Sequence, residues 1–568
     1  MKYSRKFIIL LFFSFCFYWT AWATDYYVDS NSGNDSWDGL YPTYQGGSNG
    51  PWKTLIRVNS ATINPGDTVN LRRGSIWYAE SDFIGFIVNW NGTANSPIIL
   101  QPYGSGDKPI ICGGTIETEW IGPDENGVYY KVTSYGDWLL EDYKALNLAS
   151  DATCSDGNWY KDASKVYYKP TTGVPGDHIL IRLVRPGINL YAANGQSVSY
   201  IIIDGIKFFG KGVVSDHTSK FNLHDITIKN CDFAHARDTV TIYCRYYPGL
   251  YENITVKNNT FDYSRFGPLF SAWSQSDRGF NNVIISGNKI THSNMLIYGG
   301  RWQTPGQDTN ALYLQNLRNS IIEHNDISGI CDGKGAIEHW AHANFNSTGV
   351  VFRYNYIHDI LGAGITWGGD GFGTNSAEIY GNIIINCGTG TTDSIYGGLR
   401  LRNTQSAANP SKVYNNVIIN ADRGVYAANT NKYIFKNNII TSSRVSHVAF
   451  NTSPIGDNTL DFNCYYPDVG VKFQVGPNNY NFSGWKNATG QDANSFVSDP
   501  KLINPDGGDF RLDIGSPCIK AGTDVGLDKD YHGNSWRNPP SMGAIEYFRI
   551  GGVISLRTIG GAHYKPKP

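Results

Sequence analysis

Short apolar segments with one fixed polar position recur eight times between residues 228 and 441. In each segment an apolar residue stands three positions before the fixed position, and another stands two positions after it. The segments read IKNCDF, VKNNTF, ISGNKI, IEHNDI, FRYNYI, IYGNII, VYNNVI and FKNNII. The fixed positions are Cys231, Asn259, Asn288, Asn325, Asn355, Asn382, Asn416 and Asn438. Their spacing of 22 to 37 residues is typical of a stacked array of repeats rather than of a globular domain.

One coil per repeat, with an asparagine at the same corner each time, predicts an all-β parallel β-helix. An inward asparagine at a bend can hydrogen-bond the asparagine of the next coil, and it can satisfy backbone groups that the turn leaves unpaired. Residues about thirty positions apart in the sequence are then expected to lie side by side on a shared outer wall.

The N-terminus has the pattern of a signal peptide. Basic residues precede an apolar run from Phe7 to Trp19, and Ala21-Trp22-Ala23 forms a cleavage site. We therefore expect residues 1–23 to be removed and the chain to be secreted or periplasmic, without a membrane span. A lipid anchor at Cys16 is the weaker alternative.

The repeat divides the rest of the chain into five parts. These are an N-terminal cap with the first coils (24–111), inserted hairpins (112–198), regular coils that carry the active groove (199–465), irregular C-terminal coils with a cap (466–552) and a tail (553–568). In the first part, residues 51–55 lead into a short helix that covers the open edge of the first coil. In the insert, the alternating stretches 128–132 and 159–169 predict the hairpins.

Composition narrows the classes of partner. The net charge is −2 and charged residues make up 17% of the chain. The sequence therefore lacks the excess of basic residues that is typical of nucleic-acid-binding proteins. Eight cysteines follow the signal segment, but none forms a C-x-x-C pair, so the sequence gives little support for a zinc site. The sequence does not select disulfide pairs, and Cys231 is expected to pack inward.

Three groups of motifs resemble secreted bacterial right-handed β-helix proteins that act on polysaccharides. They are the opening YYVDSNSGNDSWDGL with PWKTL and NPGDTVNLRRG, the Asn-x-Ile coils, and the closing SPCIKAG with DYHGN and MGAIEY. The insert GNWYKDASKVYY and the later HDILGAGITWGGD are more similar to β-helix glycoside hydrolases of the fucosidase and xylanase type than to pectate lyases. The resemblance implies a right-handed helix and a carbohydrate-active enzyme, but one fold hosts several reactions.

A second strand in each coil is expected to carry the site. If Leu312, Ile337, Ile365 and Leu399 point inward, the alternation of a strand places two columns of side chains outward. The first column is Tyr313, Glu338, Thr366 and Arg400, and the second is Gln315, Trp340, Gly368 and Arg402. His342 and Asp370 share a third register. By the same alternation, Trp367 and His339 are expected to face the interior.

This wall has the side chains that a sugar-binding groove needs. Aromatic rings stack on sugar rings, whereas carboxylates and arginines bind hydroxyl or uronate groups. The predicted substrate-binding residues are Arg400, Arg402, Trp340, Tyr313, Trp302 and Tyr396. Trp302 lies on the insert 292–310 and Tyr396 on the insert 388–397, and both inserts are expected to form groove walls.

Glycoside hydrolysis requires two carboxyl groups across the bond. The predicted catalytic residues are Asp370, Glu338, Asp332 and His342, with Glu338 and Asp370 as the first pair and His342 tuning or orienting Asp370. A fully extended strand would separate this pair by more than about 10 Å, so the glycines beside Asp370 must bend the chain back. The structural alternatives are a solvated Glu338 and an Asp370 that only caps a turn.

Asp308, Asp332, Asp359 and Asp393 all fall just before the second strand of a coil. This row favours turn capping, with His358-Asp359 as a turn, and a calcium-binding row is the alternative. No other metal or cofactor is expected.

The sequence therefore predicts a secreted, monomeric glycoside hydrolase that acts on a polysaccharide or oligosaccharide. The second hypothesis is a polysaccharide lyase on a uronic-acid polymer, in which Arg400, Arg402, Lys334 or His342 would act as base or bind the acid group. An Arg400–Glu338 ion pair with a structural role is an equally ordinary explanation of that arginine. The third hypothesis is a carbohydrate-binding β-helix without catalytic activity.

Overall fold

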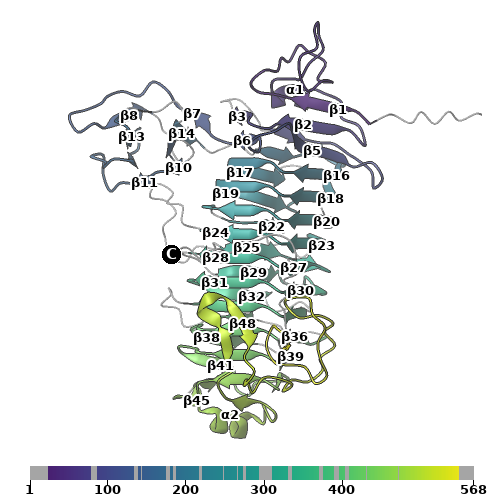
Figure 1. Ribbon diagram of the computed structural model, residues 1–568, viewed down its shortest axis with the longest axis vertical. Coiled ribbons are helices and arrows are strands. Elements are labelled where there is room, and N and C mark those ends of the chain that lie inside the picture. The colour runs from purple at the N-terminus through teal and green to yellow at the C-terminus, as the bar shows by residue number, and fades with distance from the viewer. Residues whose placement is uncertain are drawn as a thin grey trace, which may run out of the picture.

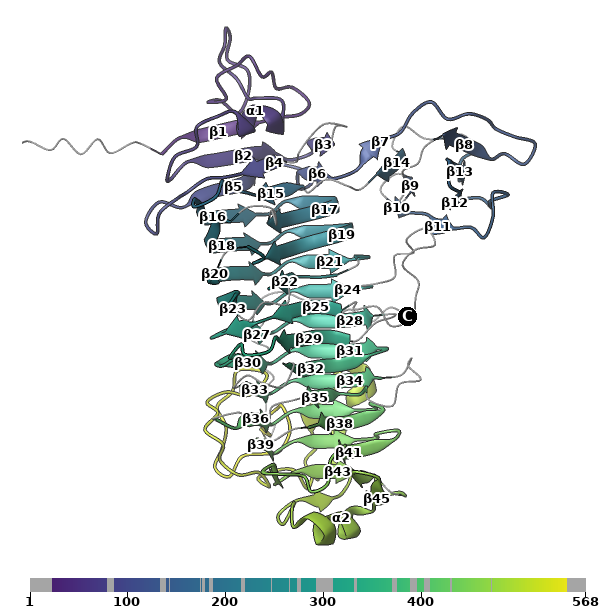
Figure 2. The same cartoon turned by 180° about the vertical axis from the view of Figure 1, so that it is seen from behind.

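The computed structural model is an elongated parallel β-helix whose coils stack along the long axis (Figures 1 and 2). It describes residues 23–78, 86–132, 139–141, 144–173, 175, 179–182, 187–215, 220–246, 248–264, 266–272, 277–292, 310–330, 335–369, 375–388, 396–402, 409–429, 432–470 and 472–548. The predicted all-β parallel helix is confirmed, and its right-handed sense stays a prediction. Within the described residues no helix has the length and apolar character needed to cross a membrane. The predicted signal segment up to residue 22 and the predicted tail lie outside them.

Three walls of parallel strands enclose the interior. Wall A consists of β1 (Asp25–Val28), β2 (Thr68–Arg72), β5 (Ile98–Tyr103), β16 (Ser197–Asp204), β18 (Asn222–Lys229), β20 (Leu250–Lys257), β23 (Gly279–Ser286) with β26 (Leu317–Arg318) beside it, β27 (Ile321–Glu323), β30 (Val350–Arg353), β33 (Ala377–Tyr380), β36 (Ser411–Tyr414), β39 (Tyr433–Lys436) and β42 (Thr459–Asp461). Walls B and C belong to one 24-stranded sheet, in which the long strands β17 (Lys207–Ser215) and β19 (Asp232–Tyr243) span both walls.

The pairing of the other strands of that sheet assigns each of them to wall B or to wall C. Wall B contains β3 (Ile76–Tyr78), β6 (Ile110–Cys112), β21 (Thr260–Asp262), β24 (Lys289–Thr291), β28 (Asp326–Ile330), β31 (Tyr356–Ile360), β34 (Ile383–Cys387), β37 (Val417–Ile419), β40 (Ile439–Thr441), β43 (Cys464–Tyr466) and β46 (Phe496–Val497). Wall C contains β4 (Phe86–Val88), β15 (Ile188–Leu190), β22 (Leu269–Ser271), β25 (Asn310–Gln315), β29 (Gly335–Ala341), β32 (Ala363–Gly369), β35 (Leu399–Arg402), β38 (Arg423–Ala428), β41 (Ser446–Phe450) and β44 (Phe473–Val475), which also pairs with β45 (Asn478–Tyr480). One coil therefore crosses wall A, wall B and wall C in turn.

The asparagine ladder forms the corner between walls A and B. Asn325 Nδ2 donates to Asn355 Oδ1 at 3.0 Å, and Asn355 Nδ2 donates to Asn382 Oδ1 at 2.9 Å. The predicted ladder is confirmed from Cys231, whose N–H donates to Asn259 Oδ1, down to Asn438. It continues for one further rung to Asn463, which the sequence pattern did not include.

The residue before each rung adopts a left-handed backbone conformation, with φ between 50° and 66°. These residues are Asn230, Asn258, Gly287, His324, Tyr354, Gly381, Asn415, Asn437 and Phe462. Asparagine and glycine tolerate this conformation best, which explains their frequency at this position. The bend turns the chain from wall A to wall B and points the next side chain inward.

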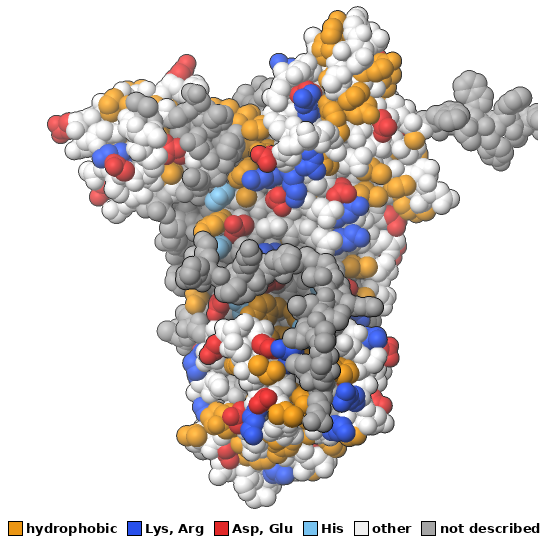
Figure 3. Space-filling model, in the orientation of Figure 1, with side chains coloured by type: hydrophobic (Ala, Val, Ile, Leu, Met, Phe, Trp, Pro, Cys, Tyr) orange, Lys and Arg blue, Asp and Glu red, His pale blue; other side chains and the backbone are white. Residues whose placement is uncertain are grey.

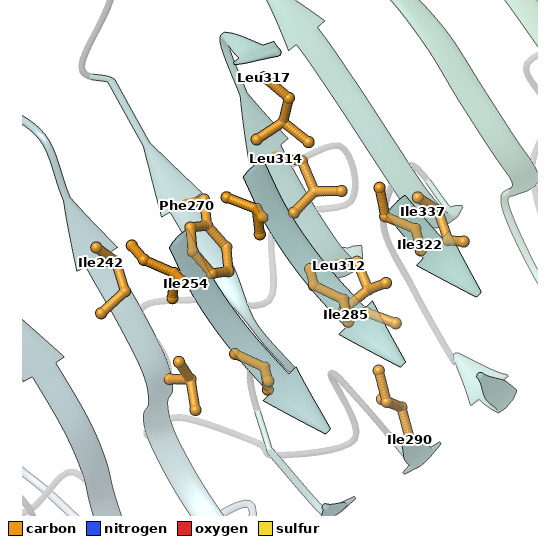
Figure 4. Close-up of a cluster of buried hydrophobic side chains, with 14 of the residues drawn as sticks. Ile242, Ile254, Phe270, Ile285, Ile290, Leu312, Leu314, Leu317, Ile322 and Ile337 are labelled. Atoms are coloured by element: carbon orange, nitrogen blue, oxygen red, sulfur yellow. The ribbon is translucent and has the colours of Figure 1, made fainter. Parts of the chain in front are cut away.

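Branched and aromatic side chains fill the space between the walls. In one coil Ile322 of wall A, Ile327 of wall B and Ile337 of wall C are all fully buried. Figure 4 shows such side chains from neighbouring coils meeting in the interior. Each fully buried side chain of this size contributes about 1.5–3 kcal/mol of transfer free energy, so the core grows with every coil.

Both ends of the helix are covered. At the N-terminal end, Thr54 caps α1 (Leu55–Asn59), and Leu55 and Val58 pack on the first coils, as the sequence predicts. At the other end, α2 (Phe482–Thr489) places the fully buried Trp485 against Phe450 and Phe473, with ring centroids 6.2 and 5.5 Å away.

The C-terminal segment, residues 498–548, runs back along the outside of wall B and is drawn in yellow in Figure 1. It contains β47 (Leu502–Asn504), a 3-10 turn (Pro505–Gly507) and β48 (Asp509–Leu512). Phe510, Leu512 and Met542 pack on the outward side chains of Ile383 and Val417. This segment, called the strap below, covers an apolar strip on the later coils.

The insert forms a lobe beside the N-terminal coils (Figures 1 and 2). One sheet joins β11 (Asn147–Leu148), β12 (Asn158–Lys161), β13 (Lys165–Lys169) and β8 (Tyr129–Val132), and the other joins β10 (Lys144–Ala145), β9 (Leu140–Glu141), β14 (Ile179–Arg182) and β7 (Thr115–Ile116). Strands β12 and β13 form the hairpin expected within 159–169, and β8 pairs with the free edge of β13. Trp159, Tyr168, Val166 and Leu139 give the lobe its own core.

Seven cysteines lie within the described residues, and all seven are buried free thiols. Burial raises the pKa of Cys231 and of Cys112 to about 12. A hydrogen bond between Cys464 and Cys518, together with burial, raises the pKa of Cys464. Because the thiolate is the reactive form, we expect a chromogenic thiol reagent to modify at most Cys331 in the native protein, together with Cys16 where residues 1–23 are retained. The other seven should react only after denaturation, and rapid labelling of any of them without denaturant would contradict this prediction.

Buried histidines predict acid sensitivity. Burial lowers the pKa of His447 to about 4, and its Nε2 lies 2.9 Å from the carbonyl oxygen of Pro467. The unfolded chain takes up this proton near pH 6.5, so the unfolded state binds more protons between about pH 6.5 and 4. The free energy of unfolding should therefore fall with decreasing pH in this window, by up to about 1.4 kcal/mol per pH unit for this histidine. Urea unfolding of wild type and His447→Gln across the window checks this, because the variant should show a shallower dependence. An equal slope in both proteins would contradict it.

Candidate functional site

Wall C places the predicted side chains in register. Tyr313 of β25 pairs with Glu338 of β29, which pairs with Thr366 of β32. Thr366 in turn pairs with Arg400 of β35. The side chains expected to face inward are fully buried in the core, namely Leu312, Ile337, Ile365 and Leu399. The alternate residues of these strands therefore face outward, as predicted. Tyr313, Glu338, Thr366 and Arg400 are called the polar column below.

Glu338 is a carboxylate held at a buried position. Its side chain is 2% exposed, and Asn310 Nδ2 donates a 2.6 Å hydrogen bond to Oε2. Asn310 is in register with Gly335, which lies three residues before Glu338 on β29. Asn310 was not among the predicted site residues, and the repeat pattern does not single it out. Burial of a carboxylate is costly unless it is hydrogen-bonded, so this contact fixes Glu338 in one orientation.

Arg400 is a buried cation for which the described residues provide no acidic partner. It is 6% exposed, and its Nε and Nη1 have no hydrogen-bond partner. Its guanidinium carbon lies 4.9 Å from the ring centroid of Tyr396. No acidic side chain within the described residues forms an ion pair with Arg400, so the Arg400–Glu338 pair considered from the sequence is not present. Thr366, between them in the column, is fully buried and its Oγ1 is also unpaired.

The remaining attraction between Glu338 and Arg400 is small. Two coil steps of about 4.8 Å separate their backbones by about 10 Å. At an effective dielectric constant of about 20, unit charges at that separation attract by about 1.7 kcal/mol. Desolvation of one buried ion costs several kcal/mol, so Arg400 is incompletely compensated.

The second column brings an arginine over a tryptophan. The guanidinium carbon of Arg402 lies 4.6 Å from the ring centroid of Trp340, although a coil separates them. Gly368 stands between them in register with Trp340, and a Cβ there would lie 2.8 Å from the Cβ of Arg402. The missing side chain therefore permits the stack. Arg402 occupies one face of Trp340, so sugar stacking on Trp340 is left to the other face.

The other predicted substrate-binding residues differ in exposure. Tyr396 is 8% exposed, and its ring centroid lies 4.9 Å from the guanidinium carbon of Arg400. Tyr313 is half-buried and accepts a 2.8 Å hydrogen bond from Gln315 Nε2 through its hydroxyl group. Trp302 lies outside the described residues, as do 293–309 and 389–395 of the predicted groove walls.

Two of the four predicted catalytic residues, Asp370 and Asp332, also lie outside the described residues. His342 follows the end of β29 and is 9% exposed, and its backbone N–H donates to Asn316 Oδ1 at 2.8 Å. The structure therefore brings Glu338, Thr366 and Arg400 into one column and places His342 at its strand end.

His339 and Trp367 face the interior, as predicted. Their rings stack with centroids 4.2 Å apart, and both are fully buried. Ser347 Oγ lies 3.2 Å from His339 Nε2, which supplies the partner that the sequence did not identify. Burial lowers the pKa of His339 to about 3, so the ring is neutral.

The prediction of a turn at His358-Asp359 is wrong, because both residues lie in β31. Asp359 still has a left-handed φ of 55°, and its Oδ1 accepts from Asn386 Nδ2 of the next coil at 2.8 Å. Burial opposes the charge on His358, but hydrogen bonds to Asp326 and Asp359 raise its pKa. Asp308, Asp332 and Asp393 lie outside the described residues, so the calcium row stays a prediction.

Charge is mixed on one face of the molecule. On the face shown in Figure 3, basic and acidic side chains are interspersed, in agreement with the net charge of −2.

No family model matches the sequence, and no curated protein matches it significantly. The fold is similar to the solved structure of XylC with xylose, which has 12% sequence identity and a TM-score of 0.52 over 93% of this chain and 99% of that chain. Lacto-N-biosidase GH136 from Eubacterium ramulus has 16% identity and a TM-score of 0.44, covering 84% of this chain and 67% of that one. Pectate lyase Pel9A has 13% identity and a TM-score of 0.39, covering 93% and 97%. At such identities a structural likeness shows the fold alone.

Proposed function

We propose that this protein is an exported, monomeric glycoside hydrolase that cleaves a polysaccharide or oligosaccharide on the outer face of wall C. Glu338 and Asp370 form the carboxyl pair, and Asp332 is the alternative second carboxyl group. Tyr313, Trp340 and Arg402 bind sugar rings, with Trp302 and Tyr396 from the inserts.

The observation that carries the proposal is the environment of Glu338. A carboxylate with no catalytic role on the outside of a solenoid is normally solvated. Glu338 is instead 98% buried and held at 2.6 Å by Asn310. Arg400 stands in the same column, and among the described residues its Nε and Nη1 have no hydrogen-bond acceptor. Buried charged groups of this kind gather at functional sites.

The chemistry requires one protonated and one ionised carboxyl group. The acid, assigned to Glu338, donates its proton to the glycosidic oxygen as the bond from that oxygen to the anomeric carbon breaks. The second carboxylate, assigned to Asp370, either attacks the anomeric carbon or removes a proton from the water that does so. Asn310 keeps the Glu338 carboxyl group in one orientation throughout, which supports proton transfer along a fixed direction.

A polysaccharide lyase is the second candidate, and the unpaired guanidinium of Arg400 favours it. In β-elimination a cation neutralises the uronate carboxylate while a base removes the neighbouring proton. Arg400 is suited to the first role, because an arginine almost never loses its own proton.

Turnover assays on a panel of neutral and acidic polysaccharides test the proposal. A hydrolase produces new reducing ends without an unsaturated product, whereas a lyase produces a product that absorbs in the ultraviolet. We expect reducing ends alone, and we expect Asp370→Asn to remove activity without a change in folding. Ultraviolet absorbance would replace the proposal by the lyase, and an absence of both products would replace it by a binding module.

A further inference from the structure

We propose that Arg400 and Thr366 bind the anionic substituent of an acidic sugar, a carboxylate or a sulfate ester. Arg400 is 94% buried, and its Nε and Nη1 have no acceptor. The hydroxyl group of Thr366, its direct neighbour in the next coil, is fully buried and also unpaired. Buried donors are normally hydrogen-bonded, so two adjacent donors without an acceptor among the described residues are suited to an acceptor that a ligand brings.

The shape of the guanidinium agrees with such a ligand. Its planar fork of N–H groups matches the paired oxygens of a carboxylate, and sulfate oxygens can accept from the same fork. Tyr396 lies against the guanidinium at 4.9 Å, which fixes the plane of the fork. Within the described residues no carboxylate competes for Arg400, in contrast to Arg353 of wall A, which is bound to Glu323 Oε2 at 2.6 Å.

The choice of a sugar rests on the proposed function, and the position of Arg400 adds to it. Two coil steps, about 10 Å, separate Arg400 from Glu338 along wall C. The acidic group therefore belongs to a sugar that neighbours the cleaved bond and not to the leaving-group oxygen. The site would thus select polymers that carry an acidic residue next to the bond that is cut.

Binding of uncleaved monosaccharides tests this inference separately from turnover. Titration calorimetry or NMR would compare D-galacturonate and D-glucuronate with galactose 6-sulfate, galactose and glucose at constant ionic strength. We expect an acidic sugar to bind wild type at least about 10-fold more tightly than its neutral counterpart. Tighter binding by the uronates or by the sulfated sugar distinguishes the two sources of the anion, and either result supports the proposal.

Three variants complete the test. Arg400→Gln should weaken acidic-sugar binding about 10- to 100-fold and remove the preference for acidic over neutral sugars. It should not lower Tm, because it removes an unpaired buried charge. Arg400→Lys keeps the charge but loses the fork, so an intermediate loss is expected. Arg353→Gln is the matched control, and its affinity should equal that of wild type.

Equal affinity of wild type for acidic and neutral sugars would overturn the inference. Unchanged binding of acidic sugars in folded Arg400→Gln, or in Arg400→Lys if the first variant fails to fold, would also overturn it. Because no bond is cleaved in these measurements, a protein without turnover can still bind acidic sugars, and a hydrolase of neutral polymers can still fail this test.

Discussion

Glu338→Gln is expected to reduce kcat by about 10²- to 10⁴-fold, the usual contribution of a general acid or base. Glutamine has the same shape as glutamate and keeps an oxygen that can accept from Asn310 Nδ2, so the local structure should persist. It has no proton to donate to the glycosidic oxygen and no negative charge. Initial rates on the polysaccharide identified by the panel, with reducing ends as readout, measure the loss.

Folding and charge must be separated from catalysis in this experiment. Tm of Glu338→Gln should stay within about 2 °C of wild type, which shows that the variant is folded. The matched control is Glu378→Gln on wall A, where Glu378 forms an exposed ion pair with Lys412 at 2.7 Å. Its kcat should equal that of wild type, because an exposed pair contributes little and lies outside wall C. A wild-type kcat in folded Glu338→Gln would remove Glu338 from the proposed mechanism.

The fold and the polar column could be predicted because both depend on simple periods. Apolar residues on each side of a fixed asparagine define one coil, and the alternation within a strand then decides which side chains point outward. Register follows once the ladder is aligned, which is why Tyr313, Glu338, Thr366 and Arg400 are neighbours as expected. The handedness is not encoded in this pattern.

The contacts between side chains of the site were harder to predict than their register. One of them depends on the absence of a side chain, at a glycine. Arg402 reaches Trp340 because Gly368, which stands between them, has no side chain. Nothing in the repeat pattern identifies Asn310 as the partner of Glu338. A glycine in a strand is normally a weak point, and the sequence pattern gives no reason to assign it a partner. The stack of Arg402 on Trp340 in fact leaves less of the ring for a sugar than the sequence suggested.

The strap was missed although the sequence contains a signal for it. The residue after each ladder position points outward on wall B, and it is polar in the earlier coils, as in Asp232, Lys289 and Asp326. From Ile383 onward it is apolar, which is explained by the cover that residues 498–548 provide. A change from polar to apolar at one outward position over several coils therefore predicts a covering segment, even where its own sequence is irregular.

The ladder itself gives the largest expected effect on stability. We expect Asn355→Ala to lower the free energy of unfolding by about 3 to 4 kcal/mol. The side chain of Asn355 donates to Ile322 O and Asn382 Oδ1, both at 2.9 Å. Its Oδ1 accepts from the backbone N–H and the Nδ2 of Asn325 at 3.1 and 3.0 Å. Alanine removes all four bonds and leaves buried groups on both neighbouring coils without partners, each at a cost of about 1–3 kcal/mol. Urea unfolding followed by far-ultraviolet circular dichroism measures the change.

The control variant must lose the hydrogen bonds of an asparagine side chain at an exposed position. Asn281 of wall A donates to Glu252 Oε1 at 3.1 Å and accepts from Asn319 Nδ2 at 2.9 Å, and both bonds are exposed. Water can replace these bonds, so Asn281→Ala should cost less than about 1 kcal/mol. A similar small loss in Asn355→Ala would mean that the neighbouring coils re-pair without the ladder. The stacking that holds Glu338, Thr366 and Arg400 in one column would then depend on the pairing of the wall C strands and on the apolar core. A large loss confined to the buried rung instead identifies the ladder as the element that keeps the coils, and with them the proposed site, in register.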